Sequence, residues 1–213
     1  MLTKSQPCNA MCAALALGCT GLAITADRAA AQDQDTLSGY YISTAAGLNL
    51  ASDLNAPAVS ISSRPGVRGD ASVGRAWRLA GDFSAGAEIQ AGLLYNPLDK
   101  AKTQGQSVSV GGSLMDVPLL AHAVLHWQFQ PHWVAYAGMG AGCAFSSLHI
   151  SSTAGNYGLN GTKVDFAWQA MTGIRYRFGS NEIGLGYEYF SFHRSGVQTV
   201  GNKTILASYT FCF

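Results

Sequence analysis

Apolar residues occupy every second position over long stretches of this chain. The clearest stretch runs from residue 202 to residue 213, where only Leu206 breaks the alternation. Its regularly spaced apolar residues are Ile205, Ala207, Tyr209, Phe211 and Phe213. Successive side chains of a β-strand point to opposite faces of the sheet, so this spacing predicts a strand with one continuous apolar face.

Eight stretches of the chain have this period, and we expect each of them to form one strand. They cover residues 37–50, 67–77, 83–95, 114–129, 133–145, 164–178, 182–192 and 202–213. The connections between them alternate in length. Tight turns are expected at 79–82, 131–132 and 179–181, and long polar loops at 52–65, 96–112, 146–163 and 193–201. The second stretch is the least regular, because Gly69 and Arg75 interrupt its apolar positions.

Apolar faces of this size need an environment other than water, since soluble domains seldom expose them. The alternative for the last stretch is the edge strand of a soluble β-sandwich. Charged residues are only 12% of the chain, against roughly 25% in soluble domains. After the N-terminus no apolar run reaches the roughly 18 residues of a membrane helix. We therefore predict an all-β fold, an eight-stranded antiparallel up-and-down transmembrane β-barrel whose apolar faces meet lipid.

The N-terminus has the composition of a cleaved secretory signal peptide. Lys4 precedes an apolar run over residues 10–26, and Ala29 and Ala31 form an Ala-x-Ala site. We predict a signal peptide at residues 1–31 and the barrel domain at residues 32–213; cleavage after Ala26 is the alternative. A lipoprotein cysteine at Cys19 is less favoured, because the residues before it do not resemble a lipobox.

The chain resembles the OmpA-type and opacity-type eight-stranded outer-membrane barrels. Tyr209, Phe211 and Phe213 are similar to the C-terminal signature of that family, and residues 134–142 resemble its fifth strand. The resemblance implies the outer membrane of a Gram-negative bacterium, with loops extracellular and both mature termini periplasmic. It also implies contact with outer-membrane lipids and lipopolysaccharide, insertion machinery that reads the three aromatic residues, and an extracellular ligand for the loops. A net charge of +1 gives no reason to expect nucleic acid.

Charged and polar residues fall on the inward faces of the predicted strands. The interior of an eight-stranded barrel is just wide enough for side chains to fill it, so we expect these residues to form a cross-strand network without a wide pore. The alternative is an ion or proton path. The predicted network comprises Arg68, Asp70, Glu88, Asp116, His122, His126, Asp165, Gln169, Arg175, Arg177 and Glu188. Arg78, Gln90 and Glu182 also have inward positions.

Small residues complete the interior. Gly138, Gly140 and Gly142 form an inward stripe that leaves room for large neighbours. Cys143 and Cys212 fall on strands that are not neighbours, so we expect free thiols and no disulfide.

The pattern points to no catalytic, cofactor or metal site. His122 and His126 are four residues apart, about 13 Å along a strand, which is too far to share a metal ion. His193 and Ser195 have the spacing of a lipid A deacylase, but no acid follows them to orient the histidine. We therefore expect a non-enzymatic structural or surface-interaction protein, acting in envelope integrity, adhesion or host contact. The alternatives are a lipid-modifying enzyme and a narrow porin-like conductance.

Overall fold

The computed structural model describes residues 38–56, 59–103, 106–152, 155–192 and 200–213. Within these ranges the chain forms eleven β-strands, and no helix there has the length and apolar content to cross a membrane. The strands are β1 (Gly39–Ala51), β2 (Leu54–Ala56), β3 (Val59–Ser63), β4 (Gly66–Arg78), β5 (Phe83–Thr103), β6 (Gln106–Ser109), β7 (Gly111–Gln130), β8 (Trp133–Ser152), β9 (Gly155–Phe178), β10 (Asn181–Phe192) and β11 (Val200–Cys212). The predicted signal peptide, 1–31, lies outside the described residues.

Eight of these strands close into a barrel. Each of β1, β4, β5, β7, β8, β9, β10 and β11 pairs antiparallel with its neighbour along the chain, and β1 pairs with β11 to complete the ring. At the seam, the Tyr40 amide donates to the Phe213 carbonyl at 3.1 Å and the Phe213 amide donates to the Tyr40 carbonyl at 2.9 Å. The predicted eight-stranded antiparallel barrel is therefore confirmed.

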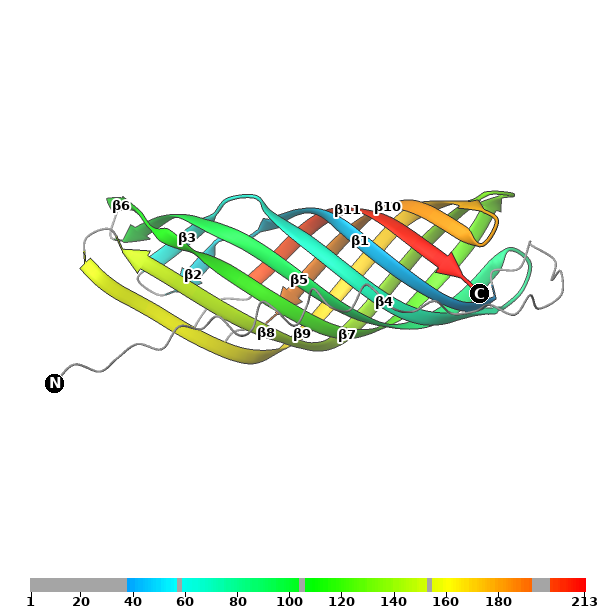
Figure 1. Cartoon of the computed structure of the whole chain (residues 1–213), viewed down its shortest axis with the longest axis horizontal. Coiled ribbons are helices and arrows are strands. Elements are labelled where there is room, and N and C mark those ends of the chain that lie inside the picture. Colours follow the sequence, from blue (N-terminus) through cyan, green and yellow to red (C-terminus); the bar gives the residue numbers. More distant parts are fainter. Residues whose placement is uncertain (1–37, 57–58, 104–105, 153–154, 193–199) are drawn as a thin grey trace, which may run out of the picture. The chain divides into compact units, whose positions relative to one another are not determined.

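The two ends of the barrel differ. Tight turns join β4 to β5 and β9 to β10, where Gly81 and Gly179 have φ of 56° and 61°. These left-handed conformations are unstrained only for glycine. The C-terminus lies at this turn end, while β2, β3 and β6 lie at the opposite, loop end (Figure 1).

Three predicted loops contain more regular structure than expected. β2 and β3 form a hairpin within 52–65, β5 and β6 pair within 96–112, and β8 and β9 continue into 146–163. The sequence pattern weakens there because turn-forming and polar residues such as Pro97, Asp99 and Lys100 occupy positions that are apolar in the barrel strands. Backbone pairing between the strands nevertheless continues, as between Lys100 and Ser109. In the fourth predicted loop, residues 193–199 lie outside the described residues.

The outward faces of the barrel strands are apolar, as the alternation predicted. Leu48 and Met139 are each 66% exposed, and exposed leucine, isoleucine, valine and aromatic side chains occur on all eight barrel strands. Aromatic pairs gather toward the turn end: Phe83 stacks on Trp127 at 6.1 Å between ring centroids, and Tyr40 stacks on Phe213 at 6.2 Å. The exposed Arg75 guanidinium lies 4.9 Å from the Tyr40 ring centroid, so this aromatic group also includes a charge.

The inward glycines of β8 make space for neighbouring side chains. A Cβ atom on Gly140 would lie 2.0 Å from Cδ2 of His122, and one on Gly142 would lie 2.1 Å from the Leu119 carbonyl oxygen. Both distances are far below van der Waals contact, so these strands approach closely only because the side chains are absent. The expected role of the glycine stripe, room for a large neighbouring side chain, is confirmed at Gly140, whereas Gly142 makes room for the backbone of β7.

Replacing Gly140 by alanine should therefore destabilise the barrel by about 1–3 kcal/mol, because the His122 ring must move within a packed interior. Urea unfolding of the refolded protein in micelles, followed by tryptophan fluorescence, measures this loss. Gly69→Ala is the matched control, since its Cβ would have only ordinary contact at 3.9 Å. The variant carrying both Gly140→Ala and His122→Ala should lose less stability than the two single variants lose together. Strictly additive losses would contradict a clash between the alanine Cβ and the His122 ring.

Candidate functional site

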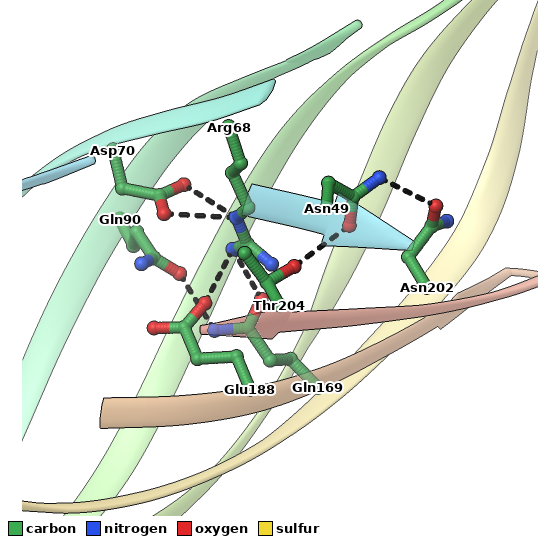
Figure 2. Close-up of polar contacts among 8 residues, drawn as sticks. All are labelled: Asn49, Arg68, Asp70, Gln90, Gln169, Glu188, Asn202 and Thr204. Carbon is green, nitrogen blue, oxygen red and sulfur yellow. Dashed lines mark hydrogen bonds and ion pairs between the residues drawn. The ribbon is translucent and has the colours of Figure 1, made fainter. Parts of the chain in front are cut away.

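The centre of the barrel interior is organised around Arg68 on β4, which is only 2% exposed. Its Nε donates to the Asp70 carboxylate, at 3.1 Å to Oδ1 and 2.8 Å to Oδ2. Arg68 and Asp70 are two residues apart on one strand, so both side chains point inward. Figure 2 shows the carboxylate facing the guanidinium side-on.

The far end of the Arg68 guanidinium connects three further strands. Its Nη2 donates to Oε1 of Gln169 on β9 at 2.7 Å and lies 2.8 Å from Oε2 of Glu188 on β10. Gln169 in turn donates through Nε2 to Oε1 of Gln90 on β5 at 3.0 Å. One arginine thus links four strands of the ring, and its charge faces two buried carboxylates (Figure 2).

A second group of polar contacts lies on β1, β5 and β11. Nδ2 of Asn49 donates to Oδ1 of Asn96 at 2.6 Å and to Oδ1 of Asn202 at 2.9 Å, while the Thr204 hydroxyl donates to Oδ1 of Asn49 at 2.7 Å. All four residues are at most 1% exposed. The sequence analysis did not single them out. Asn49 and Thr204 fall on the inward faces of their predicted strands, whereas Asn96 falls in a predicted loop and Asn202 at the end of a predicted strand.

A third group surrounds Glu88 on β5. The Tyr41 hydroxyl donates to Oε2 of Glu88 at 2.9 Å, and Nδ1 of His122 lies 3.7 Å from Oε1. The His126 ring meets the Tyr41 ring edge-on at 6.4 Å. His122 and His126 therefore both face the interior. His122 lies near Glu88, whereas His126 contacts Tyr41, whose hydroxyl donates to Glu88.

Arg175 and Arg177 of β9 converge on Glu182 of β10. Nε of Arg177 donates to Oε1 of Glu182 at 2.9 Å, and Nη1 of Arg175 lies 3.6 Å from Oε2. Arg175 also lies over the Tyr136 ring at 4.3 Å. A single carboxylate thus faces two guanidinium groups.

Three further residues were expected to point inward. Asp116 is buried opposite Ser146 on β8, and Asp165 is half-buried opposite Ala144. Oδ2 of Asp165 accepts no hydrogen bond from any residue that the structure describes. Arg78 was expected to point inward with the network but is exposed, because it is the last residue of β4 and lies at the end of the barrel.

Part of the interior is apolar, which the list of inward polar residues did not anticipate. The core residues are Leu54, Leu94, Leu98, Leu114, Leu120, Ala144, Ala167, Phe190, Phe192 and Val200, all at most 7% exposed. Leu114, Phe192 and Val200 of this core lie near the loop ends of β7, β10 and β11, whereas Leu94, Leu120 and Ala167 lie near the middle of their strands. An interior cavity of about 30 Å³ remains beside Glu88, Arg175 and Glu188, room for no more than a few water molecules.

The described residues offer no group of three or more histidine, cysteine, aspartate or glutamate side chains that could hold a metal ion. The described cysteines, Cys143 on β8 and Cys212 on β11, are free thiols on strands that do not pair. His193 and Ser195, the residues of the deacylase-like spacing, lie outside the described residues.

No protein-family model matches the chain, and no curated protein matches it. Solved structures that are similar to the chain include the following three. Neisserial surface protein A superposes with a TM-score of 0.54 at 17% identity, covering 83% of this chain and 98% of that one. The outer-membrane protease OmpT of Escherichia coli gives 0.51 at 7% identity, with 84% and 100% covered. The outer-membrane enzyme PagL gives 0.46 at 13% identity, with 79% and 97% covered.

At such low identities the likeness concerns the fold. Neisserial surface protein A and OmpT, both with a TM-score above 0.5, are a surface protein and a protease, so the fold does not distinguish a binding role from an enzymatic one. Together with the closed ring of eight strands, it establishes the architecture. The chain has the fold of the small eight-stranded β-barrels of bacterial outer membranes.

Proposed function

We propose that the chain is an integral outer-membrane protein with a structural or surface-interaction role, no enzymatic activity and no wide pore. One observation carries this proposal: apolar side chains are exposed around the ring, while charged side chains are buried inside it. Water would penalise both arrangements. In a bilayer, the exposed side chains meet acyl chains and the buried charges are paired across the lumen.

The absence of a wide pore follows from the filled interior. The Arg68 group and the apolar core occupy the space within the ring, and the charged members of the Arg68 group are held by partners on other strands. A hydrated path through the barrel would have to separate these ion pairs and wet the buried leucine and phenylalanine side chains. Both steps are costly, which disfavours the narrow conductance.

The surface role is supported by the loop end. There β5, β8 and β9 continue beyond the apolar belt and carry exposed polar residues such as Lys100 and Lys102. Paired strands of this kind can hold the connecting loops in fixed positions toward a ligand outside the cell. Envelope integrity, adhesion and host contact are the roles that fit. We propose that residues 1–31 direct export and that both mature termini are periplasmic.

A tag placed between Thr103 and Gln106 should be reached by antibody on intact cells, and the protein should fractionate with the outer membrane. This follows because the β5–β6 connection lies at the loop end, which we assign to the extracellular side. Whole-cell labelling before and after lysis provides the measurement. A freely soluble protein, or a tag reached only after lysis, would contradict the proposed location.

Lipid A from the same cells serves as the control for the enzymatic alternative. Its acyl chains, measured by mass spectrometry, should be the same with and without the protein. Loss or gain of an acyl chain would favour a lipid-modifying enzyme.

Phe213→Ala should lower the amount of protein in the outer membrane, because Phe213 packs at the β1–β11 seam and belongs to the proposed assembly signature of Tyr209, Phe211 and Phe213. It stacks on Tyr40 and, at 6.0 Å, on Phe211. Immunoblots of membrane fractions measure the abundance. Leu50 is an exposed apolar residue at the other end of β1, and Leu50→Ala should leave the abundance unchanged. Equal loss in both variants would contradict the assignment of the signature.

Arg68→Leu should destabilise the barrel by about 3–5 kcal/mol, because Asp70 and Glu188 would remain buried without their cation. Urea unfolding in micelles measures the change. Adding Asp70→Asn and Glu188→Gln should restore part of the loss by removing the unpaired charges. The control is Arg75→Leu on the outer surface of the same strand, where a cation–π contact is worth about 1 kcal/mol or less. Similar losses at Arg68 and Arg75 would show that the buried network does not stabilise the fold.

A further inference from the structure

A cleft opens at the turn end of the barrel, away from the polar interior. It has a volume of about 390 Å³ and lies between the β4–β5 turn and the β7–β8 turn. Its lining combines two charges, two amides and two aromatic rings, from Arg78, Asp82, Gln128, Gln130, Phe83 and Phe129. This mixture differs from the mostly apolar outer surface of the strands and from the ion-paired interior.

The walls of this turn-end cleft are fixed by hydrogen bonds. The Gln128 amide donates to the Asp82 carbonyl at 2.9 Å, which joins one turn to the neighbouring strand. Nε2 of Gln128 donates to the Pro131 carbonyl at 3.1 Å, and the Phe83 amide donates to the Ala80 carbonyl at 3.2 Å. The cleft is therefore preformed, and a ligand would not have to order it.

The two charges in the cleft are not used within the barrel. Among the described residues, neither Arg78 nor Asp82 takes part in an ion pair, although both line the same cleft. A guanidinium suits a phosphate group, and a carboxylate suits a primary ammonium group. A ligand that carries both groups a few bonds apart would match the two charges together, whereas a simple anion would meet the Asp82 carboxylate.

The aromatic side of the cleft indicates where such a ligand would have its apolar part. Phe83 and Phe129 line the cleft and are also exposed on the outer surface, 42% and 40% respectively. Trp127 lies between them, with ring-centroid distances of 6.1 Å to Phe83 and 5.7 Å to Phe129. Aromatic residues in this position mark the level where lipid headgroups meet acyl chains. The cleft thus joins a charged pocket to the lipid-facing surface.

We propose that the turn-end cleft binds the headgroup of a phosphoethanolamine lipid from the leaflet on the turn side. Arg78 holds the phosphate, Asp82 holds the ammonium group, and the acyl chains run over Phe83 and Phe129. The inference rests on the membrane location proposed above and adds a specific lipid site to it.

Native mass spectrometry of the refolded full barrel in micelles tests the site. Phosphatidylethanolamine should bind about tenfold more tightly than phosphatidylglycerol, which has no ammonium group, and than phosphatidylcholine, whose methylated nitrogen cannot donate to Asp82. Glycerophosphoethanolamine, which has the headgroup without chains, should bind more weakly than the lipid. Equal binding of the three lipids would overturn the proposal.

Single substitutions test whether the lipid binds in the cleft or is held by general charge attraction at the turn end of the barrel. Arg78→Gln and Asp82→Asn should each remove the preference for phosphatidylethanolamine, while Arg75→Gln, on the same strand but outside the cleft, should keep it. Migration on gels with and without boiling shows whether each variant is folded. Preference retained in both cleft variants overturns the site alone. A wild-type barrel that does not enter phospholipid vesicles overturns the proposed membrane location and the site with it.

Discussion

Backbone hydrogen bonding without water is the constraint on which the rest of this structure depends. In hydrocarbon an unpaired amide or carbonyl has no substitute partner, so a sheet is tolerated only when its first and last strands meet. The seam between β1 and β11 provides this closure, from Tyr41 opposite Cys212 to Ala51 opposite Asn202. The ring of eight strands then sets the interior width, and that width determines which side chains fit inside.

The narrow interior explains the balance of charges. Arg68 can be buried because Asp70 and Glu188 surround it, and these acids tolerate burial because Arg68 is there. Replacing such a group by apolar residues often costs little stability. These charges have partners only in this register of strands, so a shifted register would leave them buried and unpaired. The asparagine group around Asn49 depends in the same way on the register of β1, β5 and β11, without charge.

The sequence predicts the fold well because apolar outward residues alternate with polar or small inward residues along each barrel strand. It predicts the inward position of Arg68, Glu88 and His122, since parity alone settles it. It does not predict which residues of other strands they contact, because that depends on the stagger between neighbouring strands. Asn96 was missed for a different reason. The polar and turn-forming residues after Tyr95, among them Pro97 and Asp99, predict a loop, although the backbone pairing of β5 continues to Thr103.

The closing contacts join parts of the chain that are far apart in sequence. Asn49 and Asn202 are separated by 153 residues, and Ser43 and Thr210 by 167. Contacts at such separations carry a large loop-closure entropy and form late during folding. Until then β1 and β11 each present an open edge able to pair with another chain. Slow ring closure therefore lengthens the time during which these open edges can pair with another chain.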